Sequence, residues 1–92
     1  MTLSLDKLSA VLIDRGKTHG DFSVQSTICF NLKTTMRSGP RALSAPQKEA
    51  LEMIAVKISR IISGDPYEID HWVDIAGYAK LVSDMLEKKS DK

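Results

Sequence analysis

The chain of 92 residues has few of the features that mark secreted, disulfide-bonded or membrane-spanning proteins. Its one cysteine, Cys29, excludes an internal disulfide and a zinc site built from paired cysteines. No apolar run approaches the roughly 20 residues that cross a bilayer. The first residues alternate charged with apolar side chains, unlike a signal peptide. We therefore expect a cytoplasmic protein.

An excess of charge of one sign is also absent. Thirteen Lys and Arg residues stand against twelve Asp and Glu residues, which gives a net charge of +1. So small a charge provides no field that would draw the chain to nucleic acid or to an anionic membrane. The sequence shows no Ser-His-Asp or Cys-His nucleophile arrangement either, because Cys29 is most simply a packed thiol inside a predicted helix.

What the sequence does contain is helical periodicity bounded by start and stop signals. Asp21 is placed to cap a helix, and Ser44 with Gln47 forms a capping box ahead of another, which Gly64 closes. Gly16 marks the end of the first helix. The pattern predicts helices over about residues 4–14, 21–36, 44–62 and 69–87.

Short connections between these helices predict an all-α fold, an antiparallel bundle of about four helices. Residues 1–92 are expected to form a single helical domain, since a chain of this length makes one domain. Residues 87–92 are expected to form a frayed basic tail.

The third and fourth predicted helices each carry apolar residues on two faces. At about 100° per residue, the broader stripes are expected to be core. These stripes are Leu51, Ile54, Ala55, Ile58, Ile61 and Ile62, and Trp72, Ile75, Ala76, Ala79, Val82 and Leu86. The second rows opposite them are Glu49, Met53, Val56 and Arg60, and Asp70, Asp74, Tyr78, Leu81 and Met85. Since a small bundle buries one stripe, the second rows predict a homo-oligomer, and Gly77 in mid-helix predicts a close neighbour.

Acidic residues on the same two helices form the strongest candidate site. Glu49 and Glu52 lie three positions apart, and Asp70 and Asp74 four, so each pair shares a helix face. Carboxylates on neighbouring helices can converge on Mg²⁺, which prefers oxygen ligands and bridges to phosphate. The alternative is that these acids are solvated or lie at the rim of an interface.

Basic and aromatic residues complete the candidate ligand-binding set. Residues 15–21 (RGKTHGD) place cationic side chains ahead of a helix N-terminus, where backbone amides favour anions. Asp21 would compete with phosphate for those amides, so a capped turn and a phosphate cradle both stay open. The segment is not a Walker motif. The full set is Arg15, Lys17, His19, Lys57, Arg60, His71 and Tyr78.

Two segments carry a family resemblance, residues 15–22 (RGKTHGDF) and residues 70–79 (DHWVDIAGYA). Together with Met53, Lys57 and Arg60, they resemble a family of small, uncharacterised phage and prophage proteins. The resemblance covers residues 15 to about 86. It implies a protein that works in the cytoplasm of a host cell.

The third and fourth helices also resemble, more distantly, the all-α nucleotide pyrophosphohydrolases of the MazG type. Glu49 and Glu52 resemble the first acidic pair of that group, and Asp74 resembles the aspartate of its second motif. His71 stands where that motif has glutamate, and Asp70 lies one place away. The resemblance implies an oligomeric, Mg²⁺-dependent nucleoside triphosphate pyrophosphohydrolase, or a descendant that binds nucleotide without hydrolysing it.

Two functions follow from these observations. The first is a phage-type oligomeric protein that binds a nucleotide or related phosphate ligand, with hydrolysis left open. The second is a non-catalytic phage accessory protein that inhibits a host defence factor or sequesters a signalling molecule. The second function needs no metal.

Overall fold

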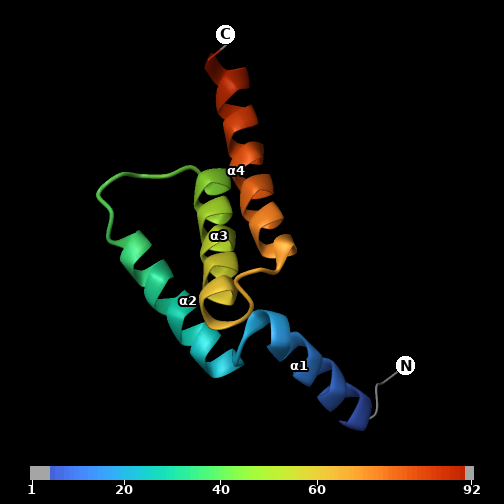
Figure 1. Cartoon of the computed structure of the whole chain (residues 1–92). Coiled ribbons are helices and arrows are strands. Elements are labelled where there is room, and N and C mark those ends of the chain that lie inside the picture. The colour runs from blue at the N-terminus through green and yellow to red at the C-terminus, as the bar shows by residue number, and fades with distance from the viewer. Residues whose placement is uncertain (1–4, 91–92) are drawn as a thin grey trace.

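The computed structural model of the chain describes residues 5–90. The described part folds into four helices without a strand: α1 (Leu5–His19), α2 (Phe22–Arg37), α3 (Ala45–Ser63) and α4 (Ile69–Ser90). Figure 1 shows the helices packing against one another with short connections. The prediction of an all-α helical bundle is confirmed.

The predicted start signals of α2 and α3 lie where the sequence placed them. The side chain of Asp21 accepts hydrogen bonds from the backbone N–H groups of Ser23 and Val24 at the start of α2. At α3, Ser44 and Gln47 form both bonds of the capping box, at 3.0 and 3.3 Å. These bonds satisfy backbone donors that have no partner within the helix.

The predicted end of α1 is wrong. Helix α1 continues through Gly16 to His19, and Gly20, at φ +84°, ends it with its N–H bonded to the carbonyl oxygen of Gly16 at 2.9 Å. A glycine inside a helix costs only about 1 kcal/mol, which the contacts of the last turn described below offset. Helix α4 likewise extends to Ser90, into the segment predicted as a tail.

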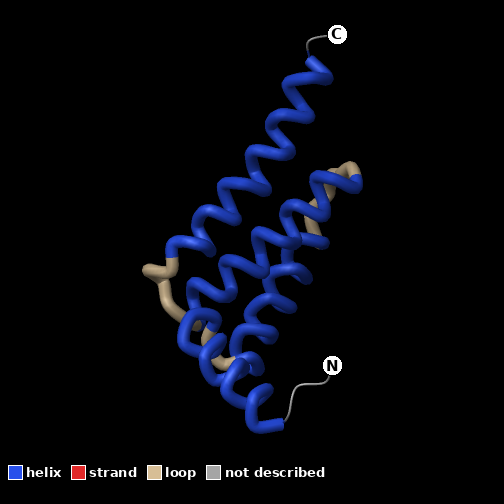
Figure 2. Tube along the Cα trace, turned by 90° about the vertical axis from the view of Figure 1, so that its right-hand side faces the viewer, coloured by secondary structure: helices blue, strands red, loops and turns tan. Residues whose placement is uncertain are grey.

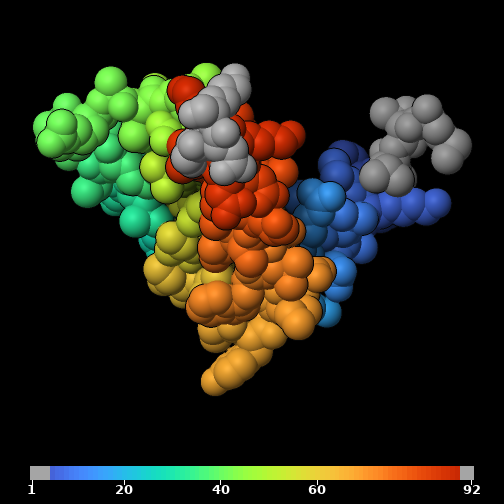
Figure 3. Space-filling model, turned by 90° about the horizontal axis from the view of Figure 1, so that it is seen from above, coloured from blue at the N-terminus to red at the C-terminus, as the bar shows by residue number. Residues whose placement is uncertain are grey.

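Helix α3 is the middle member of a layer of three helices. Glu52 reaches Arg37 of α2, and Ala55 and Ser59 follow Glu52 at helical spacing and are fully buried. The other side of α3 carries Lys57, which pairs with Asp74 of α4. In the described part of the chain α2 and α4 do not contact each other, and Figures 1 and 3 show α3 between them.

This single layer leaves part of the expected core stripe uncovered, which is a second correction. Leu51 and Ile62 of α3 are 42% and 63% exposed, and Trp72 of α4 is 53% exposed. The buried apolar side chains in the described part are small and few, namely Cys29, Ala50 and Ala55. Helix α3 has α2 and α4 beside it and α1 against its C-terminal end, and none of the three covers the face that carries Leu51 and Ile62.

Helix α1 projects away from the layer, as Figures 1 and 3 show, and Figure 2 shows the described part of the chain as helices joined by loops. Its side chains from Leu5 to Arg15 are exposed, whereas Thr18 and His19 in its last turn are partly buried. Helix α1 therefore joins the other helices through its C-terminal turn. No helix in the described range is long and apolar enough to cross a membrane.

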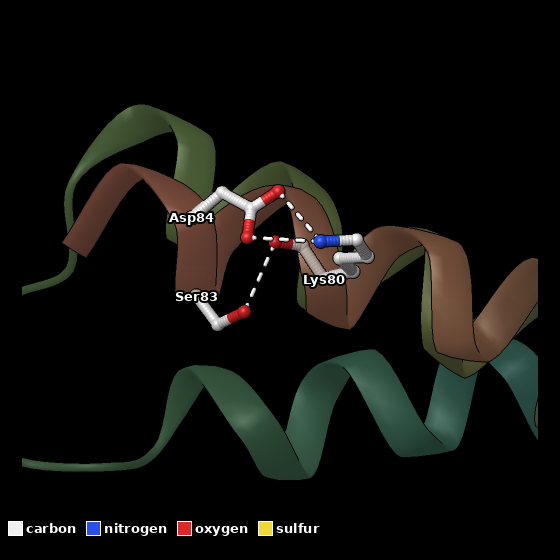
Figure 4. Close-up of polar contacts among 3 residues, drawn as sticks. All are labelled: Lys80, Ser83 and Asp84. Atoms are coloured by element: carbon white, nitrogen blue, oxygen red, sulfur yellow. Dashed lines mark hydrogen bonds and ion pairs between the residues drawn. The ribbon is translucent and has the colours of Figure 1, made fainter. Parts of the chain in front are cut away.

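The outer face of α4 is polar. Lys80 Nζ lies 3.1 Å from both carboxylate oxygens of Asp84, and the hydroxyl of Ser83 donates to the backbone carbonyl of Lys80 (Figure 4). The Lys80–Asp84 pair is exposed and one turn apart, so it adds only about 0.3–0.5 kcal/mol to the stability of the helix.

Candidate functional site

The junction between α1 and α2 crosses the junction between α3 and α4 at very close range. The backbone N–H of Asp65 donates to the carbonyl oxygen of Thr18 at 3.0 Å, and the hydroxyl of Ser63 donates to the carbonyl oxygen of His19 at 3.1 Å. A Cβ atom on Gly20 would overlap the backbone of Ser63, and one on Gly64 would overlap the backbone of Thr18. The crossing therefore requires glycine at both positions.

The crossing holds the end of α1 against the end of α3 and the start of α4, and a polar pocket lies between these three segments. Its volume is about 380 Å³. The lining residues are Thr18, His19, Lys57, Arg60, Glu68, Asp70, His71 and Asp74. Two consecutive helices, α3 and α4, and the distant end of α1 thus contribute to one pocket.

His71 anchors the floor of the pocket. It is 3% exposed, and its Nε2 lies 3.2 Å from the carbonyl oxygen of Thr18. A carbonyl oxygen only accepts hydrogen bonds, so Nε2 carries a hydrogen and the bond fixes the ring orientation. The His71 ring lies 5.2 Å from the His19 ring, centroid to centroid, at a tilt of 53°. Both histidines of the chain therefore belong to this pocket.

Lys57 and Asp74 form an ion pair at one wall. Lys57 Nζ lies 3.0 Å from a carboxylate oxygen of Asp74, and the two side chains are 11% and 45% exposed. A nearly buried ammonium group needs a partner, because taking a charge out of water is costly. Asp74 supplies that partner from the water-accessible side.

Arg60 has a polar atom that the protein leaves unsatisfied. Its Nε is buried and makes no hydrogen bond to any residue in the described part of the chain. An unsatisfied buried donor costs about 1–3 kcal/mol, and more when the group is charged. Arg60 lines the pocket, so a bound acceptor is a natural partner for its guanidinium group.

The pKa of His19 is lowered by its surroundings in the same pocket. Burial is the main cause that lowers its pKa from 6.5, and the positive charges of Arg60, His71, Lys57 and Arg15 lower the pKa further. His19 is therefore neutral at pH 7 and sits among cationic groups. A neutral imidazole can accept a proton or donate a hydrogen bond to a ligand.

Six residues that the sequence singled out meet in this pocket: His19, Lys57, Arg60, Asp70, His71 and Asp74. The remaining acids do not join them. Glu49 is exposed, and Glu52 pairs with Arg37 at 3.4 Å on the α2 side of α3. Within residues 5–90 no three His, Cys, Asp or Glu residues form a group suited to hold a metal ion. The expected convergence of Glu49, Glu52, Asp70 and Asp74 is thus not seen, because Glu52 lies on the α2 side of α3 and Glu49 lies near the start of α3, at the opposite end of that helix from the pocket.

Other predicted ligand residues lie outside the pocket. Arg15 and Lys17 are exposed on α1, and Arg15 acts on the pocket only through its charge near His19. Tyr78 lines a shallow apolar depression of about 580 Å³ with Gly77 and Leu81. Within residues 5–90 nothing lies within 4 Å of a Cβ built on Gly77, so the close neighbour expected there is not seen.

The N-terminus of α2 settles the alternatives left open for residues 15–21. The carboxylate of Asp21 occupies the amides of Ser23 and Val24, and residues 15–19 belong to α1. The segment is therefore a helix end followed by a capped turn. Two residues of the pocket were not predicted from the sequence. They are Glu68 and Thr18, which takes part through its carbonyl oxygen. Gly20 and Gly64 were the sequence signal that could have indicated the crossing of the two junctions.

The fold and the pocket define a small all-helical protein with a polar site where two of its junctions cross. Residues 5–86 match the family described as a domain of unknown function, DUF6378. The match covers most of the chain, and the protein belongs to this family. No curated protein and no solved structure matches the chain.

Proposed function

We propose that the polar pocket binds a phosphate-bearing small molecule of the nucleotide class. The observation that carries the proposal is Arg60, whose buried Nε has no acceptor among the described residues. Guanidinium groups bind phosphate through charge-assisted hydrogen bonds, which are about twice as strong as neutral ones. A phosphate group in the pocket would lie beside Arg60 and neutral His19, and it would satisfy the buried Nε once the guanidinium group turned toward it.

The acidic residues of the pocket suit the remainder of a nucleotide. Asp70 is exposed at the start of α4, and Glu68 lies just before that helix. Carboxylates accept hydrogen bonds from sugar hydroxyl groups and from base N–H groups. A pocket lined by both cations and hydrogen-bond acceptors fits a ligand with an anionic end and a donor-rich end.

We propose that Mg²⁺ binds together with the nucleotide and not on its own. Mg²⁺ in proteins is commonly held by one or two carboxylates together with substrate phosphates. Asp70 and Asp74 are the two predicted metal ligands that line the pocket, and they would approach an ion carried by the phosphates. Such a contact would compete with the ion pair between Asp74 and Lys57 and would free Lys57 to face the phosphate.

The resemblance to MazG-type pyrophosphohydrolases supports a nucleotide as the ligand, and the resemblance to phage proteins supports a role in a host cell. Our proposal stops at binding. Glu52, which resembles part of the first acidic pair of the MazG group, is engaged with Arg37 outside the pocket.

Thermal unfolding with added ligands tests the proposal. The panel is inorganic phosphate, pyrophosphate and the four common nucleoside triphosphates, each with and without Mg²⁺. At least one nucleotide should raise the Tm of the natural protein, because a ligand that binds only the folded state stabilises it. The Arg60→Met variant should lose the shift. The Arg37→Met variant, which removes an exposed arginine outside the pocket, should keep it.

Two results would refute the proposal. One is a Tm that no ligand of the panel changes, and the other is an undiminished shift in the Arg60→Met variant. Pyrophosphate release measured on the same panel separates binding from hydrolysis. A nucleotide that stabilises the protein without turnover identifies a binding protein and rules out pyrophosphohydrolase activity on that nucleotide.

A further inference from the structure

The chain exposes far more surface than a compact protein of its mass. Its accessible surface is 7228 Å², whereas a folded monomer of 10.2 kDa exposes about 5,300 Å². Its radius of gyration is 16.3 Å, against about 12 Å for a compact chain of this length. The layer of helices thus leaves roughly 1,900 Å² more surface uncovered than folding in isolation normally does.

Part of the uncovered surface lies on one face of α3 and α4, which we call the open apolar face. Its α3 members recur at helical spacing, and so do its α4 members. They are Leu51, Ile54, Ile58 and Ile62, and Trp72, Ala76, Ala79 and Leu86. An apolar groove of about 330 Å³ joins the two stripes, since Leu51, Ile54, Ala79 and Leu86 all line it. None of these side chains is charged.

The open apolar face points away from the polar pocket. Arg60 follows Ile58 by two residues on α3, which is about 200° around a helix. On α4, Trp72 stands two residues from Asp70 and two from Asp74, with the same angular separation. A molecule that covers the open apolar face therefore leaves the pocket accessible.

We propose that a second copy of the chain covers the open apolar face, so that two three-helix layers pack face to face. Stable interfaces bury about 800 Å² on each partner, and the surplus surface of the whole chain, which this face shares with the projecting helix α1, exceeds this amount. A two-fold axis brings the same face of both copies together, and a face without charge meets its own copy without electrostatic repulsion. Two packed layers around one core are also the usual architecture of a stable domain.

The location of this interface differs from the one expected from the sequence. The second rows were expected to mediate self-association, but the structure places Arg60, Asp70 and Asp74 of those rows around the polar pocket. Four large side chains of the stripes expected to form the core of one chain remain exposed instead, namely Leu51, Ile62, Trp72 and Leu86. They become core only when two chains combine.

Sedimentation velocity of the full chain and of paired variants tests the proposal. The natural protein should sediment with the mass of two chains. The Leu51→Lys/Ile62→Lys variant should sediment as one chain of 10.2 kDa, because both side chains would enter the interface. Phe30→Lys is the matched control, since Phe30 is 67% exposed on α2 outside the face, and it should leave the dimer intact.

The fluorescence of Trp72 provides a second readout that needs no substitution. Trp72 is the only tryptophan and lies on the open apolar face, 53% exposed in one chain. Its emission should shift to longer wavelength as dilution separates the dimer. This readout decides the question even where the lysine variants fail to fold.

A natural protein that is monomeric at every accessible concentration overturns the proposal. So does an assembly that survives the double substitution but dissociates in Phe30→Lys, or whose dissociation leaves Trp72 emission unchanged. The dimer proposal and the nucleotide proposal are tested independently, because nucleotide-dependent stabilisation is measured with the Arg60 variant, and Arg60 lies on the other face.

Discussion

A Cβ atom on Gly64 would overlap the carbonyl oxygen of Thr18, although the two residues belong to different helix junctions. The same carbonyl oxygen accepts the backbone N–H of Asp65 at 3.0 Å and lies 3.2 Å from Nε2 of His71. One backbone oxygen thus connects α1 to both the end of α3 and the start of α4. The polar pocket depends on this crossing.

Substitution of Gly64 by alanine should therefore be costly. Because the obstructing atoms are backbone, they cannot move aside as a flexible side chain would, and we expect a loss of about 1–3 kcal/mol in the free energy of unfolding. Urea unfolding measures the loss. Gly77→Ala is the control, because it has open space and should gain up to about 1 kcal/mol from helix propensity. Equal stability of the two variants would contradict the tight crossing.

The ion pair between Lys57 and Asp74 predicts unequal effects of removing its two ends. Asp74→Asn leaves a nearly buried ammonium group with a weaker partner, whereas Lys57→Met removes the charge and retains much of the side-chain volume. We expect Asp74→Asn to cost about 1–3 kcal/mol and Lys57→Met to cost less. A double-mutant cycle in urea gives the coupling energy. A larger cost for Lys57→Met would show that the ammonium group does not depend on Asp74.

The lowered pKa of His19 predicts a loss of stability in acid. Folding holds the pKa below 6.5, so the unfolded chain binds a proton more readily than the folded one. The contribution of His19 to stability is therefore complete above pH 6.5 and declines as the pH falls toward the lower folded pKa.

Unfolding free energies measured across this range in the natural protein and in His19→Gln isolate the contribution. The variant should show the weaker decline between neutral pH and pH 5, because its side chain does not titrate. Identical pH profiles of the two proteins would mean that burial and the neighbouring cations do not act on His19.

The sequence predicted local features well. The caps at Asp21 and Ser44 were correct because a cap depends on a few consecutive residues. The end of α1 was wrong because Gly16 is a weak stop, and the contacts that extend the helix to His19 come from residues more than forty positions away.

How the helices pack against one another was harder to predict from the sequence. The stripe from Leu51 to Ile62 was expected to be core, but the other helices cover only part of it, because periodicity shows which residues share a face and not how fully that face is covered. The pocket was partly predicted, since Arg60, His71 and Asp74 were all named. Glu52 was misplaced because the sequence does not reveal that α2 and α4 pack on opposite sides of α3.

The imidazole NMR signals of His19 and His71 test the proposed function most directly. These are the only two histidines of the chain and both line the pocket, so their spectra report on this site alone. Titration with a nucleoside triphosphate and Mg²⁺ should shift the His19 signals and raise its pKa, because a bound phosphate offsets the charges of Arg60 and Lys57. Saturating nucleotide that leaves both imidazoles and the pKa of His19 unchanged would contradict the proposal.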